Sequence, residues 1–420
     1  MALLSVFEIV AVLLVLTAAF SWFNYVVLRL PNTIGLLVMA LASSLLLVGL
    51  EVAFPQAAFF HEMSLQVRRI DFTEAVLQVM LGYLLFAGAL QVDVSELRDR
   101  KVIVGTMASL GLFISTLAVG TMFWLAAQAI GAPISILWSL VFGALISPTD
   151  PVAVLSTLKE VNVPHRLQMD MSGESLFNDG VGVALFTVLL AAASAGEGSF
   201  GFGKLAAVIF REAAGGGALG LIAGFIAYRA MRHVDEYTIE VLISLAIATG
   251  TYALATRLEV SGPIAVVVAG VILGSRGAEV AMSRRTQRYM FGFWQLVDDM
   301  LNSVLFLLIG LEVLVLQFDS SLLPLALAAV PIVLLGRFIA VAIPIRVLSA
   351  RCGFDRGTVP MLTWGGVRGG ISIALVLSIP EDALRQPLAA ATYMVAIFTI
   401  VVQGMSLAWL ARRLGVGSAQ

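Results

Sequence analysis

Long apolar stretches separated by short polar segments recur along the whole chain. A helix needs about 20 apolar residues to cross the roughly 30 Å hydrocarbon core of a bilayer, and thirteen stretches approach that length. The predicted spans are 4–27, 31–52, 72–92, 102–128, 134–157, 168–195, 203–228, 237–256, 261–275, 290–316, 321–346, 357–379 and 388–411. Because the connections are short, we predict an all-α polytopic membrane protein in which residues 1–420 form a single membrane unit without a soluble domain.

The composition supports this interpretation and excludes several other classes of protein. Hydrophobic residues make up 60% of the chain and charged residues 12%, whereas a soluble domain has about 45–50% and about 25%. The mean hydropathy is +0.99. A net charge of -2 gives no sign of nucleic-acid binding. The single cysteine, Cys352, permits no disulfide within the chain, and nothing resembles a Cys/His metal site.

Basic residues are distributed unequally between the two predicted faces. If the even-numbered spans run outward from one face, that face collects 17 of the Lys and Arg residues and the opposite face collects 5. The remaining three, Arg211, Arg337 and Arg368, fall within spans. The positive-inside rule then places the C-terminus in the cytoplasm and, with an odd number of spans, the N-terminus outside the cell membrane.

Two of the predicted spans contain residues that interrupt a helix. The fifth contains two prolines around Asp150 in segment 147–151, and the twelfth contains four glycines around Arg368 in segment 364–370. Non-helical backbone at membrane depth is tolerated only where it is buried in protein or lines a cavity. The pair suggests two discontinuous helices within inverted structural repeats, with Asp150 and Arg368 near the functional site.

Polar residues gather on one face of the sixth span. Ser175, Asn178 and Asp179 are three or four residues apart and share a face, and Glu174 lies one turn from Asn178. A carboxylate at a helix centre costs roughly 2.5 to 3.5 kcal/mol on insertion scales, so Asp150 and Asp179 indicate ion or proton traffic. Hydroxyl, amide and carboxylate oxygens suit a small cation such as Na⁺. The alternative is that these groups only hydrogen-bond helices to each other.

Two arginines at membrane depth, Arg337 and Arg368, require intramembrane acids or carbonyls as partners. If one of them neutralises Glu174, Asp150 and Asp179 remain as the uncompensated pair. Loss of hydration favours the neutral form of a carboxyl group, which allows Asp179 to carry a proton at one time and a cation at another. Competition of the two ions for one carboxylate would couple their movements.

Five motifs in a fixed order carry a resemblance to a known family. They occupy residues 149–151, 173–180, 261–270, 302–303 ahead of 306–312, and 365–369. In this order and spacing they resemble the sodium/proton antiporters of the cation:proton antiporter superfamily, specifically the bacterial and archaeal branch with an Asn-Asp pair in the ion-site helix (monovalent cation/proton antiporter-1 type). The resemblance extends from the second span to the thirteenth. It implies a homodimer in membrane lipid that exchanges Na⁺ or Li⁺ for H⁺ by alternating access, without a cofactor and without enzyme activity.

The resemblance also implies a role for each matching residue of the ion site. Asp179 matches the carrier of the cation and the proton, while Asp150, Ser175 and the backbone of Thr149 complete the Na⁺ site. Asn178 matches the partner residue that separates this branch from relatives with Asp-Asp. From this residue we expect one proton per Na⁺ and no net charge movement.

The remaining implied roles concern charge compensation and domains. Glu174 matches a structural acid that pairs with an arginine of a later span, assigned here to Arg337, and Arg368 would offset the partial negative charge at a half-helix C-terminus. A core that carries the ion would be centred on 102–195 and 290–379. The remaining spans would form the dimerisation scaffold.

Other interpretations stay open at this point. A K⁺/H⁺ exchanger would use the same scaffold, and an intramembrane aspartyl protease would also need two aspartates, although its Gly-x-Gly-Asp signature is missing. Asp298 and Asp299 begin the tenth apolar stretch, so we interpret them as interface or loop-end residues. Glu74 is a candidate for a role in ion access. The glycines at 215–217, 220 and 224 fit either a dimer interface or internal helix packing.

Overall fold

The computed structural model describes residues 6–54, 80–92, 94–150, 163–195, 202–275, 281–312, 320–349, 353–354, 357–380 and 384–416. The main helices are α1 (Val6–Phe23), α2 (Asn32–Ala53), α5 (Leu81–Leu90), α6 (Val94–Thr106), α7 (Leu112–Ile130), α8 (Ile136–Ile146), α10 (His165–Ser194), α11 (Phe202–Met231), α12 (Tyr237–Arg257), α13 (Gly262–Ile272), α14 (Arg284–Glu312), α15 (Leu323–Leu348), α16 (Thr358–Trp364), α17 (Gly370–Leu377), α18 (Arg385–Phe398) and α19 (Gly404–Arg413). Among these residues there is no strand, which confirms the prediction of an all-α protein. Cys352 and Glu74 lie outside the described residues.

Short π-helical turns extend three of the helices. They lie at Asn24–Leu28, Met107–Gly111 and Thr399–Gln403, and the last two join α6 to α7 and α18 to α19. Within the described ranges, nine helical stretches are long and apolar enough to cross a membrane, judged by length and composition. Leu81–Leu90, Ile136–Ile146 and Gly262–Ser275 are shorter apolar helices. The total of thirteen spans, the inverted repeats and the sides of the two termini stay predictions.

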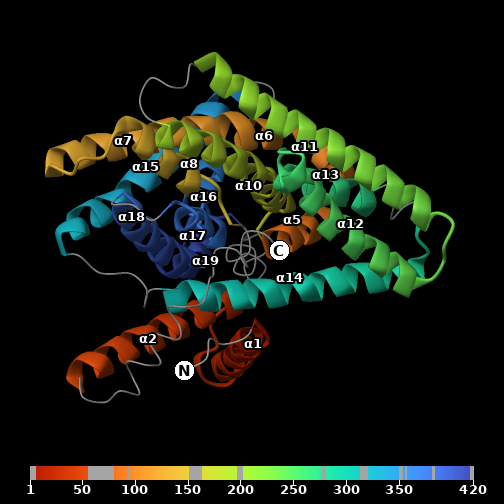
Figure 1. Cartoon of the computed structure of the whole chain (residues 1–420), viewed down its shortest axis with the longest axis horizontal. Helices are drawn as coiled ribbons and strands as arrows, with labels where there is room; N and C mark the ends of the chain where they lie inside the picture. Colours follow the sequence, from red (N-terminus) through yellow and green to blue (C-terminus); the bar gives the residue numbers. More distant parts are fainter. Residues whose placement is uncertain are drawn as a thin grey trace.

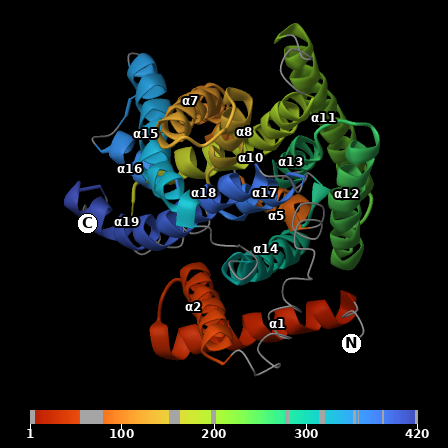
Figure 2. The same ribbon diagram turned by 60° about the vertical axis from the view of Figure 1, so that its left-hand side comes forward.

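The long helix α14 separates two parts of the molecule. In Figure 1 and Figure 2, α1 and α2 lie on one side of α14 and the other helices lie on the opposite side. Small residues allow α2 and α14 to approach closely, since a Cβ on Gly310 would lie 2.4 Å from the Cβ of Ala40. The Ser44 hydroxyl donates to the Gly310 carbonyl at 2.9 Å, so a hydrogen bond reinforces the same contact.

The glycines of α11 serve internal packing. A Cβ on Gly216 would lie 2.5 Å from the Ser261 carbonyl oxygen, and one on Gly220 would lie 2.3 Å from the Ala265 carbonyl oxygen. Both oxygens belong to the beginning of α13, so these glycines admit the neighbouring backbone. Of the two interpretations of this run, the structure therefore favours helix packing at Gly216 and Gly220.

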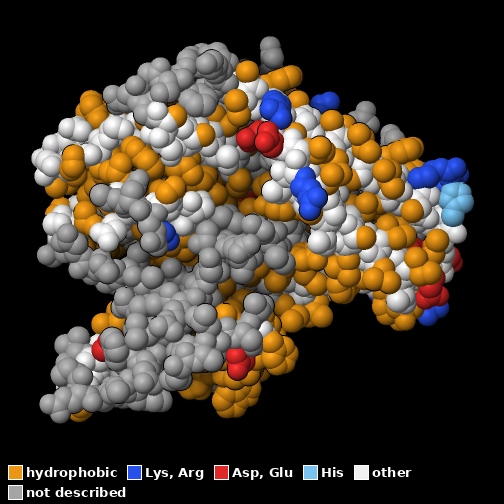
Figure 3. Space-filling view, in the orientation of Figure 1, with side chains coloured by type: hydrophobic (Ala, Val, Ile, Leu, Met, Phe, Trp, Pro, Cys, Tyr) orange, Lys and Arg blue, Asp and Glu red, His pale blue; other side chains and the backbone are white. Residues whose placement is uncertain are grey.

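The surface has the character expected for contact with lipid. Hydrophobic side chains spread over most of the described face in Figure 3, and charged side chains occur in a few places. On α11, for example, Leu221, Phe225 and Ile226 are all more than half exposed. A water-soluble protein would not expose such an extended apolar face.

The α11 glycines provide a test of this packing. Gly220→Ala should lower stability by about 1 to 3 kcal/mol, because the added methyl group would overlap the backbone of α13. Gly217→Ala on the same helix should be neutral or stabilising by up to about 1 kcal/mol, because nothing lies within 4 Å of its Cβ position. Thermal unfolding of the two variants in detergent makes the comparison. Equal melting temperatures would contradict the close contact between α11 and α13.

Candidate functional site

The two predicted helix interruptions meet in space. Helix α8 ends at Ile146, and α16 ends at Trp364 before α17 begins at Gly370. The Asp150 backbone N–H donates to the Val367 carbonyl at 2.8 Å, which joins the two non-helical segments directly. A Cβ on Gly369 would lie 2.0 Å from the Asp150 Oδ2. Residue 369 therefore has to be glycine, because a side chain there would overlap the Asp150 carboxylate.

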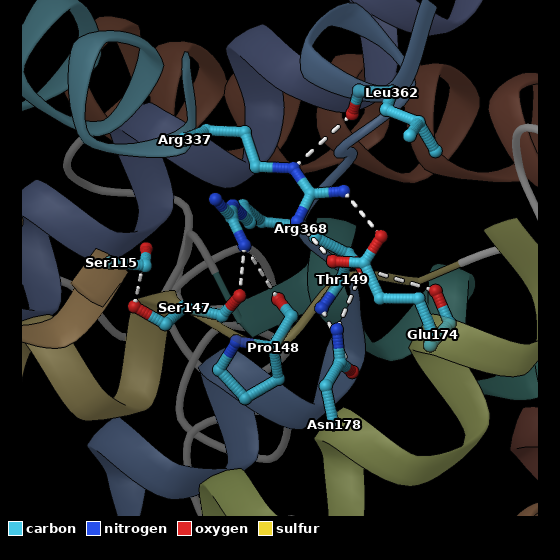
Figure 4. A network of polar contacts seen from close by, with 10 residues as sticks. Ser115, Ser147, Pro148, Thr149, Glu174, Asn178, Arg337, Leu362 and Arg368 are labelled. Carbon is cyan, nitrogen blue, oxygen red and sulfur yellow. Dashed lines mark hydrogen bonds and ion pairs between the residues drawn. The ribbon is translucent and has the colours of Figure 1, made fainter. Parts of the chain in front are cut away.

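Arg368 lies at the C-terminal end of α8. Its guanidinium is fully buried, and Nη1 donates to the carbonyl oxygens of Ser147 and Pro148, the latter at 3.0 Å (Figure 4). The last carbonyls of a helix have no partner within the helix and carry partial negative charge. The Arg368 backbone N–H donates to Thr399 Oγ1 at 3.1 Å. The structure thus places Arg368 beside the C-terminal end of the half-helix α8.

A second group of contacts holds Thr149 against α10. The Asn178 amide nitrogen donates to Thr149 Oγ1 at 3.0 Å, and the Thr149 N–H donates to the Asn178 amide oxygen at 3.4 Å. Thr149 Oγ1 and Ser175 Oγ are 3.0 Å apart and share a hydrogen bond. All three side chains are buried. Their polar groups tie the first interruption to the sixth predicted span.

Glu174 and Arg337 form a buried ion pair. Arg337 Nη1 contacts Glu174 Oε1, and Nη2 contacts Oε2 at 2.9 Å, so the pair is bidentate (Figure 4). Arg337 Nε also donates to the Leu362 carbonyl in α16 at 3.2 Å. A Cβ on Gly366 would lie 2.7 Å from Arg337 Nε, so a side chain there would displace the guanidinium. This cluster connects α10, α15 and α16.

Asp150 and Asp179 line one cavity of about 470 Å³. Its wall also includes His165, the first residue of α10, and Asp298 and Asn302 of α14. Asp179 is 7% exposed. Since Asp179 lies fourteen residues beyond His165, the cavity follows α10 for about 21 Å from its N-terminal end. Thr149, Ser175, Asn178 and Glu174 are not among the residues that line it.

The position of Asp298 corrects the sequence interpretation. Helix α14 begins at Arg284, so Asp298 lies in its middle and faces the cavity, instead of lying at a loop end. The Asn302 amide nitrogen donates to Asp298 Oδ1 at 3.0 Å. The spacing of four residues between these two polar side chains is the signal in the sequence that points to them.

A further buried ion pair was also missed. Arg100 of α6 contacts Asp170 of α10 through two bonds, from Nε to Oδ1 at 2.8 Å and from Nη2 to Oδ2. Asp170 precedes Glu174 by one turn, so Asp170, Glu174 and Asn178 follow one face of α10 at intervals of four residues. Of the three acids of α10, two are paired with arginines and the third, Asp179, faces the cavity.

Comparison with known proteins identifies the family. A sequence model described as the transmembrane region of sodium/hydrogen exchangers matches residues 11–413. The chain belongs to the sodium/hydrogen exchanger family. It is 42% identical over 415 residues to the Na(+)/H(+) antiporter NhaP of Pseudomonas aeruginosa, covering 98% of this chain and 97% of that protein. It is 34% identical over 379 residues to the Na(+)/H(+) antiporter NhaH of Halobacillus aidingensis, covering 89% and 91%.

A solved structure shares the fold of this exchanger family member. The sodium proton antiporter MjNhaP1 from Methanocaldococcus jannaschii, determined at pH 8, superposes with a TM-score of 0.74 over 96% of this chain and 97% of that one. The sequence identity is 18%, so this likeness concerns the fold alone. Together with the nine apolar helices of the described residues, family membership makes the chain a multi-pass protein of the cell membrane.

The ion pairs make a prediction about stability. Arg337→Ala should destabilise this exchanger by about 3 to 5 kcal/mol, because it leaves the buried Glu174 carboxylate unpaired. Adding Glu174→Gln to Arg337→Ala should recover part of the loss. Arg211→Ala serves as the control, since Arg211 and Glu259 form an ion pair whose side chains are 65% and 80% exposed. Loss of this exposed ion pair should lower the free energy of unfolding by about 1 kcal/mol or less.

Thermal unfolding in detergent gives the comparison among these variants. An Arg337→Ala protein that unfolds at the temperature of the Arg211→Ala protein would show that the buried pair does not support the fold.

Proposed function

We propose that the chain is a secondary antiporter that exchanges Na⁺ or Li⁺ for H⁺ across the cell membrane, one for one. The observation that carries this proposal is the cavity that leads along α10 to two carboxylates, Asp150 and Asp179, beside two crossed helix interruptions. Relatives that are 42% and 34% identical over nearly their whole length are named as Na⁺/H⁺ antiporters, which supports the same activity for this chain.

The proposed cation site is built from oxygen atoms. Asp150 and Asp179 supply carboxylates from the cavity wall, and the Ser175 hydroxyl and Thr149 backbone carbonyl complete the set. Ser175 precedes Asp179 by about one turn of α10 and already contacts Thr149, so the four groups come from one small region. Asn178 holds Thr149 in place next to them.

Coupling follows in this proposal from competition for Asp179. An empty and ionised site at membrane depth is costly, so it does not cross between the two sides without an ion. A proton or a Na⁺ neutralises it and permits the crossing. Glu174 and Asp170 do not take part, because arginines already neutralise them. With Asn178 in place of a second acid, the exchange moves no net charge.

The proposed transport cycle uses alternating access. We assign thirteen spans with inverted repeats, the N-terminus outside and the C-terminus in the cytoplasm, as the distribution of basic residues predicts. The N-terminal end of α10 then faces the cytoplasm, so the cavity opens inward. The core centred on 102–195 and 290–379 moves against a scaffold formed by the remaining spans, and the scaffold holds two copies together as a homodimer.

Proton movement in proteoliposomes tests the exchange. With a preset pH difference, addition of NaCl or LiCl should release protons, and Asp179→Asn should abolish the response because its amide cannot exchange a proton. Glu259→Gln, which alters an exposed acid, should leave transport unchanged. Clamping the membrane potential should not alter the rate if exchange is one for one. A response to KCl alone would favour a K⁺/H⁺ exchanger, and no response to any cation would contradict antiport.

The pH dependence tests the competition. Lowering the pH on the cation-binding side should raise the apparent KM for Na⁺ by up to about tenfold per pH unit, because each bound Na⁺ displaces one proton. The maximal rate at saturating Na⁺ should change much less. Initial rates measured over a matrix of pH and Na⁺ concentration separate the two effects. A falling maximal rate with a constant KM would place the controlling proton on a group other than the cation ligand.

A further inference from the structure

A second hollow lies on the outer surface, away from the ion cavity. It is a groove of about 380 Å³ between α15, α16 and α19. Its lining residues are Phe338, Pro360, Thr363, Trp364, Ser406, Trp409 and Leu410. The Trp364 indole N–H donates to Ser406 Oγ at 2.9 Å, and Ser406 Oγ donates to the Val402 carbonyl at 2.5 Å. Because the polar groups of Trp364 and Ser406 are used in these bonds, the wall of the groove is apolar.

One end of the groove is basic. A Cβ on Gly357 would lie 2.7 Å from Val416, so the beginning of α16 adjoins the end of α19. Arg412 and Arg413 occupy the last turn of α19, and both side chains are exposed. In Figure 2, α16 and α19 lie near the C-terminus, whereas α15 ends at the top of the view.

An aromatic side chain marks the boundary between the apolar groove and its basic end. The Arg413 guanidinium lies over the Trp409 ring, 5.1 Å from its centroid. Trp409 is 58% exposed and lines the groove. Tryptophan and arginine are favoured at the level of lipid headgroups. From this boundary the groove extends to Phe338 of α15.

We propose that this groove binds one acyl chain of an anionic phospholipid, with the lipid phosphate held by Arg412 and Arg413. The occupant of an apolar groove on the bilayer-facing surface is a lipid chain. The two arginines select among lipids, since each basic residue near the membrane surface attracts anionic headgroups. The side that carries them is the one that the distribution of basic residues assigns to the cytoplasm.

The bound lipid would contact the outer face of the helices that carry the ion-site arginines. Phe338 follows Arg337 on α15, and Trp364 is the last residue of α16 before the interruption that contains Arg368. The lipid therefore packs behind both Arg337 and the second interruption. An acyl chain in the groove would restrain α16 against α15 and α19.

Native mass spectrometry of the full chain tests the proposal. The protein in detergent is mixed with dioleoyl phosphatidylglycerol or dioleoyl phosphatidylcholine at equal concentration, and the retained lipid is counted. We expect phosphatidylglycerol to be retained preferentially, and the preference to fall by about tenfold in the double variant Arg412→Gln/Arg413→Gln. The double variant Arg229→Gln/Arg232→Gln removes the same charge at the end of α11 and should leave the preference unchanged.

A variant that fills the groove distinguishes the contribution of the acyl chain from that of the lipid headgroup. Leu410→Trp keeps Arg412 and Arg413 but fills the groove, so it should reduce retention of phosphatidylglycerol. Glycerol phosphate, which has no acyl chain, should not be retained by any of the proteins. Circular dichroism checks that each variant is folded. Equal retention of the two lipids, or an unchanged preference in Arg412→Gln/Arg413→Gln, would overturn the proposal. The readout is binding, so it is independent of the proposed transport.

Discussion

Backbone polar groups at membrane depth must find partners within the protein, because hydrocarbon offers none. The two interruptions at 147–150 and 365–369 would each expose such groups. In the structure they satisfy each other: the Asp150 N–H reaches the Val367 carbonyl, and Arg368 reaches the carbonyls at the end of α8. The crossing is possible because glycines at 366 and 369 leave room for Arg337 and Asp150. The positions of Asp150 and Arg368 depend on this arrangement.

The charges of α10 follow from the same constraint. Three acids on one buried helix would repel each other and lose hydration, and isolated acids would not be tolerated there. Arg100 and Arg337 engage Asp170 and Glu174, and both pairs are bidentate, which fixes their geometry as well as their charge. Only the third acid, Asp179, is directed to the cavity. The chain thus separates the acids that hold helices together from Asp179, the acid that we propose carries the ion.

The sequence alone predicts many residues of the candidate site because their signals are local. Carboxylates within apolar runs, prolines beside Asp150 and glycines around Arg368 are visible without a structure. Whether Arg337 or Arg368 meets Glu174 depends on the crossing angles of helices far apart in the chain, and the residues left that open. Asp298 and the pair of Arg100 with Asp170 were missed for another reason. Arg100 lies ahead of the predicted span 102–128, so no membrane-depth partner was sought for it. Asp298 lies inside the predicted span 290–316, but Asp299 beside it made the position resemble the end of a span.

Asn178 shows how a residue of the proposed ion site can carry two constraints. Its amide donates to Thr149 Oγ1 and accepts from the Thr149 N–H, so it uses both halves of the amide on one residue of the first interruption. A carboxylate at this position accepts hydrogen bonds but, when ionised, donates none. The proposed one-for-one exchange depends on Asn178 because an amide at this position is not a second titratable acid. The same amide also holds the non-helical segment against α10. In this proposal, the amide of Asn178 links the stoichiometry of exchange to the local fold.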